Sequence, residues 1–429
     1  MIDLEDPRAA ERAVLVGAPP AHMAHSVADE HLRELGRLAD TAGAEVVGTV
    51  VQRLDAPHPR FYVGSGKVDH IRELAEEREA GLVVFDDELS PAQGRNLEQA
   101  IGVRVVDRAE LILDIFASRA RTAEAQMQVE LAQLEYLLPR LRRMWTHLSR
   151  IRGGIGLRGP GETQLETDRR IISRRIRDLR EKLRVVERRR ETQRRSRSGE
   201  FQVALVGYTN AGKSSILRAL SGSELFVEDR LFATLDPATR AVDLDGTRVL
   251  LTDTVGFIRK LPHDLVASFR ATLEEASTAD LLLHVIDASA SDWEEHLGVV
   301  REVLDDLALA DKPTLHVFNK IDRLTHEEED ALRARLAGLF RPPPVFASAQ
   351  EEGGLDELRG ALLAAVRAER PQVTVSVPAG DGEALAALHR EGEVLSTRSE
   401  DTRVNVVVRL PLPVLGRLRG RPGVRVEGG

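Results

Sequence analysis

The segment that most constrains the fold runs from residue 201 to residue 220 and reads FQVALVGYTNAGKSSILRAL. Its apolar start predicts a buried strand that ends at Gly207, and the stretch after Ser214 predicts a helix. Between them stands the pattern G-x-x-x-x-G-K-S, whose glycines let the backbone wrap around a phosphate while successive N–H groups face the anion. Lys213 can reach the β- and γ-phosphates of a nucleotide, and the Ser214 hydroxyl can bind Mg²⁺. The segment predicts a P-loop, unless a glycine-containing turn matches the pattern by chance.

Two further predicted phosphate-binding segments follow in order. The loop RLFATLDPATR, residues 230–240, contains Thr234 and Thr239, and a GTPase needs one threonine here to bind Mg²⁺ and sense the γ-phosphate. The next predicted strand ends at Asp253, where a Walker-B aspartate should stand, and Gly256 lies three residues further on. This D-x-x-G spacing would bring the Gly256 amide to the γ-phosphate.

The motif that selects the base stands at the end of another predicted strand, in PTLHVFNKID. The carboxylate of Asp322 can accept two hydrogen bonds from guanine, whereas adenine lacks that pair of donors and would leave buried acceptors unpaired. A shorter strand then leads to Ser348, Ala349 and Gln350, where a backbone N–H would contact the guanine O6. Because these motifs follow the P-loop in order, each at a strand end, the chance interpretation fails. The sequence predicts a P-loop GTPase domain over residues 200–370 that binds guanine nucleotides.

The residues before this domain are expected to begin with a small parallel α/β domain, residues 1–120. Apolar strand candidates alternate there with helical stretches, which is typical of a parallel sheet covered by helices. The predicted strands cover residues 13–17, 44–51, 82–86 and 103–107.

Two features of this first domain have competing interpretations. Gly64–Lys67 resembles a truncated P-loop, but it lacks the four-residue gap and no buried strand precedes it, so a loop or helix start is favoured. Asp86, Asp87 and Glu88 could suggest a metal site, although charged residues at a strand end are the simpler explanation.

Residues 121–199 predict two helices that fold back on one another. The loop RGGIGLRGPGETQ separates two apolar seams, and Pro139 inside the first one predicts a kink. A homodimeric coiled coil is the alternative, but two short seams split by a glycine-rich loop favour an antiparallel hairpin. Both seams recur at alternating steps of four and three, as in heptads: Met127, Leu131, Leu134, Leu138, Leu141, Trp145 and Leu148, then Ile172, Ile176, Leu179, Leu183 and Val186.

The charge of the chain is concentrated in this hairpin. The net charge is −9, yet residues 139–199 hold 20 Lys/Arg against 7 Asp/Glu, a local +13 that leaves −22 for the rest. Arginine suits phosphate because its fork binds bidentately, so the hairpin is predicted to approach RNA, although a solvated helix face is the alternative. Trp145 and His147 could stack on bases, but the seam position of Trp145 favours packing.

The remaining residues, 371–429, predict a small α+β domain with strands at 373–378 and 404–410 and a helix between them. The whole chain is thus expected to be a multidomain α/β protein. It contains no cysteine, no apolar run of eighteen residues and no recognisable signal peptide. A cytoplasmic monomer without stable membrane insertion is the expectation.

The G motifs, the phrase LFATLDP and the upstream GGIGLRGPGETQLETDRR resemble those of the HflX family of translation-factor-class GTPases, over nearly the whole chain. The resemblance implies that Thr234 is the switch I ligand of Mg²⁺, beside Ser214, and that Lys213, Thr234 and Gly256 serve catalysis. It also implies binding to the large ribosomal subunit and its rRNA, with the hairpin loop near the peptidyl transferase centre. GTP-dependent dissociation of stalled or idle ribosomes is the implied function.

The predicted nucleotide contacts follow from these motifs. They are Gly207, Tyr208, Thr209, Asn210, Ala211, Gly212, Lys213 and Ser214 in the P-loop; Phe232, Ala233, Thr234, Leu235 and Asp236 in switch I; Asp253, Thr254, Val255 and Gly256; Asn319, Lys320, Ile321 and Asp322; and Ser348, Ala349 and Gln350.

One residue departs from the Ras-like pattern. Phe257 follows D-T-V-G where a glutamine would orient the attacking water. Intrinsic hydrolysis is therefore expected to be slow and to need help from a partner surface or another residue. Asn210 could help to hold K⁺ near the phosphates.

A GTP-gated ribosome-assembly or RNA-modification factor is the alternative function, and a signalling switch with a coiled-coil dimer is a third. The basic hairpin favours the first two.

Overall fold

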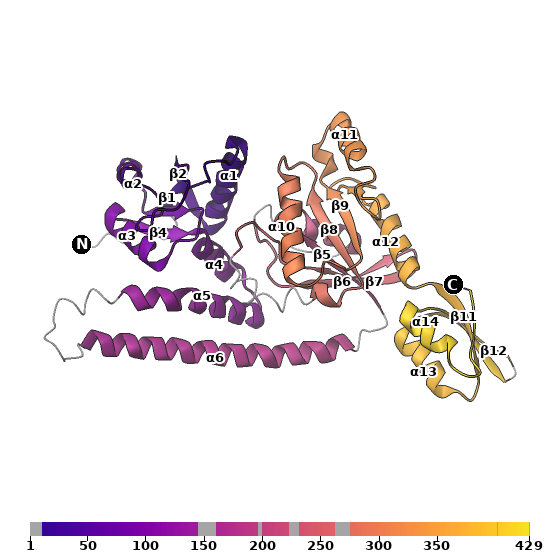
Figure 1. Ribbon diagram of the computed structural model, residues 1–429. Coiled ribbons are helices and arrows are strands. Elements are labelled where there is room, and N and C mark those ends of the chain that lie inside the picture. The colour runs from indigo at the N-terminus through magenta and orange to yellow at the C-terminus, as the bar shows by residue number, and fades with distance from the viewer. Residues whose placement is uncertain are drawn as a thin grey trace. The chain divides into compact units, whose positions relative to one another are not determined.

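A computed structural model describes this chain, with its elements labelled in Figure 1. The chain divides into two compact units: residues 1–185 join 228–236 and 258–271 in the N-terminal unit, and the remainder forms the second unit. The multidomain α/β fold predicted from the sequence is confirmed. The described residues are 11–144, 160–195, 200–222, 231–261, 275–400 and 402–428.

The N-terminal unit contains a parallel sheet of four strands in the order β2-β1-β3-β4. The central strands β1 and β3 are buried almost throughout, and their sequences are accordingly runs of apolar residues. The strands are β1 (Glu11–Gly17), β2 (Ala44–Val51), β3 (Leu82–Phe85) and β4 (Arg104–Asp107), and the helices are α1 (His25–Ala42), α2 (Ser65–Glu77), α3 (Pro91–Ile101) and α4 (Arg108–Arg119).

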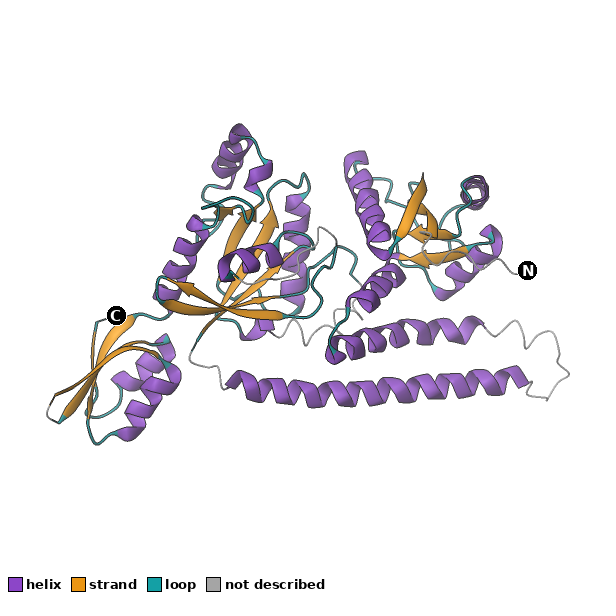
Figure 2. Cartoon of the chain, turned by 180° about the vertical axis from the view of Figure 1, so that it is seen from behind, coloured by secondary structure: helices purple, strands orange, loops and turns teal. Residues whose placement is uncertain are grey.

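Helices α5 (Ala123–Met144) and α6 (Pro160–Arg195) lie side by side and run antiparallel (Figures 1 and 2). Residues of both predicted seams pack together, with Leu131, Ile176 and Leu179 at the buried centre. Ion pairs add to this packing at the surface, since Arg175 binds Glu130 and Arg180 binds Glu135.

The last five residues of the segment predicted as a glycine-rich loop, 160–164, are helical. Helix α6 already begins at Pro160, because proline is tolerated at the first helical position. The helix continues through the basic tail of the hairpin to Arg195. Trp145, His147, Leu148, Arg152, Arg158 and the rest of the loop up to residue 159 lie outside the described residues.

The second unit contains the predicted P-loop domain, a six-stranded sheet in the order β10-β9-β8-β5-β7-β6. All neighbours pair in parallel except β6, which is antiparallel to β7, and helices cover both faces (Figure 2). The strands are β5 (Phe201–Gly207), β6 (Ala238–Leu244), β7 (Thr247–Asp253), β8 (Leu281–Asp287), β9 (Thr314–Asn319) and β10 (Val345–Ala347); the helices are α7 (Lys213–Ser221), α10 (Trp293–Asp306), α11 (His326–Leu336) and α12 (Asp356–Glu369), with a 3₁₀ turn η1 (Ile321–Arg323).

The C-terminal part is a four-stranded antiparallel sheet in the order β12-β13-β11-β14. Its sequence order βαββαβ is that of a ferredoxin-like fold. Strand β12, helix α14 and strand β14 are not predicted from the sequence, because β12 is an exposed edge strand with little apolar character and the other two are short. The elements are β11 (Gln372–Pro378), α13 (Gly382–Glu391), β12 (Glu393–Glu400), β13 (Arg403–Arg409), α14 (Leu412–Arg419) and β14 (Arg425–Glu427).

Among the described helices, none combines the length and the apolar composition that crossing a membrane requires.

Candidate nucleotide-binding site

The P-loop joins the end of β5 to the start of α7 at the centre of the large sheet. Gly207, Asn210 and Gly212 have positive φ angles of 151°, 60° and 97°. A Cβ on Gly207 would lie 2.2 Å from the Val285 carbonyl oxygen, and one on Gly212 would lie 2.1 Å from Nδ2 of Asn319. Only glycine satisfies both the backbone angle and the close approach at these two positions.

Lys213 is the first residue of α7 and is 6% exposed. Its ammonium donates hydrogen bonds to the carbonyl oxygens of Gly207, at 3.1 Å, and Tyr208, at 2.9 Å. Burial lowers the pKa of Lys213 to about 8, although the nearby Asp253 carboxylate opposes the shift. The P-loop backbone thus holds this cation inside the turn, where an anion would stabilise its charged form.

Ser214 and Asp253 form a pair of oxygen donors beside the P-loop. The Ser214 hydroxyl donates to Oδ2 of Asp253 at 2.5 Å, and Asp253 is almost fully buried at the end of β7. Within the described residues no three His, Cys, Asp or Glu side chains cluster as metal ligands. A hydroxyl and a carboxylate suit Mg²⁺, which is commonly held by one or two such groups together with phosphates and water.

The D-T-V-G segment packs directly on the P-loop. Phe257 N donates to the Gly207 oxygen at 3.1 Å, and Thr209 N donates to the Phe257 oxygen at 2.6 Å. A Cβ on Gly256 would lie 2.7 Å from Cα of Thr209 and 3.0 Å from Nζ of Lys213. Thr254 donates to the Leu205 oxygen at 2.6 Å. The Phe257 ring is 2% exposed, so this side chain packs in the interior.

The residues of the predicted base-binding side meet at the carboxyl ends of β9 and β10. Asn319 donates to the Ala211 oxygen of the P-loop at 2.9 Å. Ser348 donates to Oδ1 of Asp322 at 2.6 Å and accepts from Gln350 N at 3.2 Å. These bonds tie both segments to one another and to the P-loop, and they fix the orientation of the Asp322 carboxylate.

Asp287 also belongs to this cluster, although it is not among the site residues predicted from the sequence. It ends β8, and its Oδ2 binds Nζ of Lys320 at 2.7 Å, while its Oδ1 accepts from Ser289. Lys320 itself has a positive φ of 67°. The signal was present, because the apolar run LLLHVID ends in an acidic residue at the same sheet edge as the other motifs.

The two threonines considered for switch I lie in different units. Thr239 belongs to β6, and its hydroxyl is hydrogen-bonded to that of Thr252 on β7 at 2.9 Å. Thr234 lies in the segment Phe232–Asp236, which belongs to the N-terminal unit. In that segment Phe232 and Leu235 are buried, whereas Thr234 is half-buried.

The P-loop look-alike of the N-terminal unit has the predicted geometry of a helix start. Gly64 is the residue before α2, with an ordinary φ of −67°, and its N–H donates to the side chain of Gln52. Asp86 and Asp87 bind cationic side chains. Asp86 pairs with Arg108, and the two aspartates share the ammonium of Lys260. The simpler explanation of this acidic cluster therefore applies.

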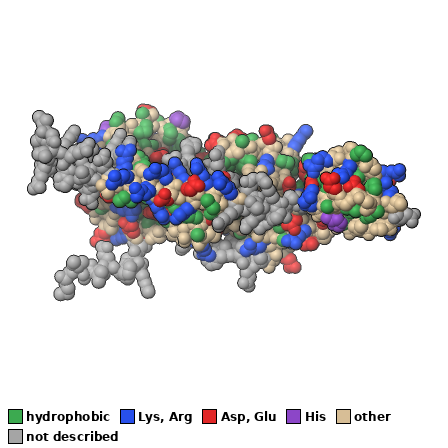
Figure 3. All heavy atoms as spheres, turned by 90° about the horizontal axis from the view of Figure 1, so that it is seen from below, with side chains coloured by type: hydrophobic (Ala, Val, Ile, Leu, Met, Phe, Trp, Pro, Cys, Tyr) green, Lys and Arg blue, Asp and Glu red, His purple; other side chains and the backbone are tan. Residues whose placement is uncertain are grey.

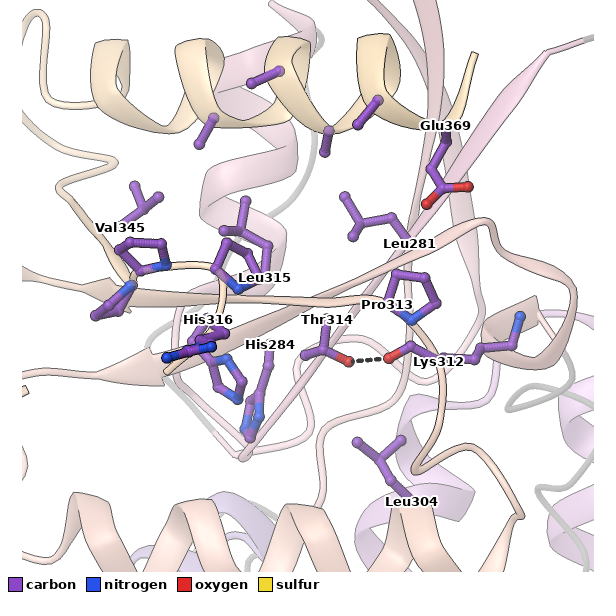
Figure 4. A pocket seen from close by; sticks show the side chains of 18 of the residues that line it. Leu281, His284, Leu304, Lys312, Pro313, Thr314, Leu315, His316, Val345 and Glu369 are labelled. Atoms are coloured by element: carbon purple, nitrogen blue, oxygen red, sulfur yellow. Dashed lines mark hydrogen bonds between the residues drawn. The ribbon is translucent and has the colours of Figure 1, made fainter. Parts of the chain in front are cut away.

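A separate cavity of about 930 Å³ lies at the amino ends of β8 and β9 and contains none of the predicted site residues. Figure 4 shows its lining, with Leu281 and Leu315 on one side of the strands and His284 and His316 on the other. Burial lowers the pKa of His284 well below its usual value and that of His316 to about 4, so both rings are neutral. A mostly apolar cavity with neutral imidazoles lacks the features of the phosphate site.

A P-loop whose helix begins with Lys213 and Ser214, followed by a D-x-x-G segment at the end of β7 and an N-K-x-D segment at the end of β9 in the same sheet, defines a P-loop GTPase. Protein-family models agree: "GTP-binding GTPase N-terminal" matches residues 29–117, "GTP-binding GTPase Middle Region" 119–197 and "50S ribosome-binding GTPase" 202–320.

The chain belongs to the HflX GTPase family. It is 47% identical to the GTPase HflX of Magnetococcus marinus over 99% of both chains. It is 45% identical to the GTPase HflX of Escherichia coli, over 89% of this chain and 90% of the relative. A GTP-binding protein from Sulfolobus solfataricus, solved with GDP, is 26% identical over 83% of this chain and 98% of its own, with a TM-score of 0.44.

Proposed function

We propose that this GTPase binds the large ribosomal subunit in the cytoplasm, as a monomer, and dissociates stalled or idle ribosomes in a GTP-dependent manner. The basic helix α6 carries this proposal. Its arginines Arg169, Arg170, Arg174 and Arg177 are exposed, and Figure 3 shows Lys and Arg side chains gathered along this face. The name of the matching family model, "50S ribosome-binding GTPase", supports the same partner.

In the proposed site, Gly207–Ser214 surrounds the phosphates and the buried Lys213 neutralises their charge. Asp253–Gly256 and switch I, Phe232–Asp236, contact the γ-phosphate end, where the Gly256 amide can donate a hydrogen bond. Mg²⁺, when held by Ser214 and Thr234, supplies further charge neutralisation at the phosphate oxygens.

The base is proposed to lie between Asn319–Asp322 and Ser348–Gln350. The hydrogen bond from Ser348 keeps the Asp322 carboxylate turned toward the guanine donors. Asn210 is proposed to help hold K⁺ near the phosphates, and hydrolysis that proceeds equally in Na⁺ and K⁺ would rule this out.

Four parts are proposed to act together: the N-terminal domain (1–120), the basic hairpin (121–199), the GTPase domain (200–370) and the C-terminal domain (371–429). The buried ring of Phe257 offers no group that could orient water. Fast hydrolysis therefore requires a residue or surface supplied elsewhere, and a ribosomal surface is the proposed source.

Sedimentation of ribosomes with this protein and a non-hydrolysable GTP analogue tests the proposal. We expect the protein to migrate with large subunits and the 70S particle to decrease. Replacing the α6 arginines Arg169, Arg170 and Arg174 by alanine should weaken this binding about tenfold or more and reduce its salt dependence, because phosphate contacts release counterions.

A matched control removes three exposed arginines of the first domain, Arg33, Arg37 and Arg78, and should bind normally. An equal loss of ribosome affinity in both variants would mean that binding depends only on the net charge of the protein and not on the position of the arginines in α6. Binding confined to immature particles would favour the alternative, a ribosome-assembly or RNA-modification factor, and would overturn ribosome dissociation as the function.

A further inference from the structure

Asp236, the last residue of the predicted switch I, is fastened within the N-terminal unit. Its Oδ2 accepts hydrogen bonds from the backbone N–H groups of Arg121 and Thr122, each at 3.3 Å. Its Oδ1 accepts a third, from the hydroxyl of Thr122. The last residue of switch I is therefore hydrogen-bonded to the two residues that directly precede α5, the first helix of the basic hairpin.

Thr122 is also the N-cap of α5. Its Oγ1 accepts from the backbone N–H of Ala125 at 3.1 Å, and its carbonyl accepts from Gln126 N at 2.9 Å. The same hydroxyl thus donates a hydrogen bond to Asp236 while it caps the helix. The Asp236 carboxylate stands at the positive end of the α5 dipole, which favours a negative charge.

The other end of switch I is attached as well. Phe232 is 2% exposed and meets the ring of Phe116 on α4 edge to face, with centroids 4.7 Å apart at 84°. Its φ of 55° is unusual for a bulky residue, so the surrounding packing holds it in this conformation. Thr234 lies midway between two anchored residues of the same short segment.

The segment after D-T-V-G is held by a buried charge network in the same unit. Arg259 donates to Glu34 at 2.8 Å and to the His31 oxygen at 2.7 Å, and Arg108 binds both Glu34 and Asp86. Arg108 and Arg259 are 1% and 6% exposed. Switch I and residues 258–261, shortly after D-T-V-G, thus both belong to the N-terminal unit.

We propose that Asp236 and Thr122 form a latch, the hairpin latch, that couples the nucleotide state to helix α5 and hence to the basic hairpin. When Thr234 responds to the γ-phosphate, Asp236, two residues further on, moves with it and tightens or releases the N-terminus of α5. The coupling is reciprocal, so a partner that holds the hairpin changes the affinity for GTP. The latch rests on the proposed function in one respect, since Thr234 must sense the γ-phosphate, and the role of the hairpin in RNA binding rests on it as well.

Three substitutions of Thr122 separate coupling from simple helix capping. Thr122→Asp keeps a good N-cap but repels the Asp236 carboxylate, Thr122→Val removes both hydrogen bonds, and Thr122→Ser keeps both. Thr122 itself is outside the proposed nucleotide contacts, and GDP binding by each variant, measured alongside, checks that its P-loop remains intact.

Hydrogen exchange of the Ala125 and Gln126 amides, both bonded to Thr122, gives the direct readout in the full chain with GDP and with a non-hydrolysable GTP analogue. We expect at least about a fivefold difference between the two nucleotide states in wild type and in Thr122→Ser. Thr122→Asp should keep these amides protected yet lose the difference, and Thr122→Val should expose them in both states. An unchanged difference in Thr122→Asp, or none in wild type, overturns the latch.

Ribosome binding supplies the second readout. The ratio of large-subunit affinities with the GTP analogue and with GDP should fall toward one in Thr122→Asp and stay at the wild-type value in Thr122→Ser. If wild type binds no large subunits in any state, the proposed function fails, while the exchange experiment still decides whether the latch exists.

Discussion

Two stretches of this chain place glycine beside a lysine at the start of a helix: Gly64–Lys67 and Gly207–Ser214. In the first, Gly64 has an ordinary φ and its N–H is taken by Gln52, while a Cβ on Gly66 would meet nothing within 4 Å. In the second, two glycines have positive φ, neighbouring atoms approach too closely for a Cβ, and the lysine is buried. The composition is similar, but only the second surrounds a space suited to an anion.

The glycines give the largest expected effect. Gly212→Ala should lower GTP affinity at least about 100-fold, because a strained φ and a clash with Asn319 together cost about 3 kcal/mol or more. Gly66→Ala, inside α2 and in open space, should bind GTP normally and melt at an equal or higher temperature. Nucleotide titration and thermal melting of both variants test this contrast, and equal GTP affinities would contradict it.

The second expected effect concerns the base, since only the P-loop has a base-binding cluster beside it. Asp322→Ala should lose most of the preference for GTP over ITP, which lacks the exocyclic amine of guanine. One hydrogen bond to a charged group contributes about 1.5–3 kcal/mol, so a preference of roughly 10- to 150-fold should fall to near unity. Competition binding of the two nucleotides measures it. A variant that still discriminates would place guanine selection elsewhere.

The smallest expected effect is a pH dependence of binding. The pKa of Lys213 is lowered to about 8, and a triphosphate binds the protonated form and raises that pKa again. The sign follows: protons are taken up on binding, so GTP affinity falls as the pH rises through 8, by about fourfold between pH 7 and pH 8.5. Isothermal titration at these two values checks it.

Lysine variants sharpen this last test. Lys213→Arg, whose guanidinium stays charged, should bind with a flat pH profile even if its affinity is lower. Lys67→Met should keep the wild-type slope. A wild-type affinity that does not change over this range would show that Lys213 remains charged in the buried turn.

Much of the fold was readable because each prediction rested on local chemistry. The P-loop turn needs glycine where φ is positive, apolar runs form the buried strands β5, β7, β8 and β9, and heptad spacing predicted that α5 packs on α6. The exposed strand β12 and the short elements α14 and β14 were missed, because weak periodicity cannot distinguish them from loops.

By itself, then, the sequence determined the α/β class, the P-loop GTPase motifs and the basic hairpin, since these depend on residue type and spacing along the chain. Only the tertiary structure decided which distant side chains meet. It brought Asp287 to Lys320 and Ser348 to Asp322, and it placed the Asp236 carboxylate on the N-cap of α5. Hydrogen bonds between residues more than twenty positions apart leave no periodic signal, because their partners are chosen by the packing of whole elements.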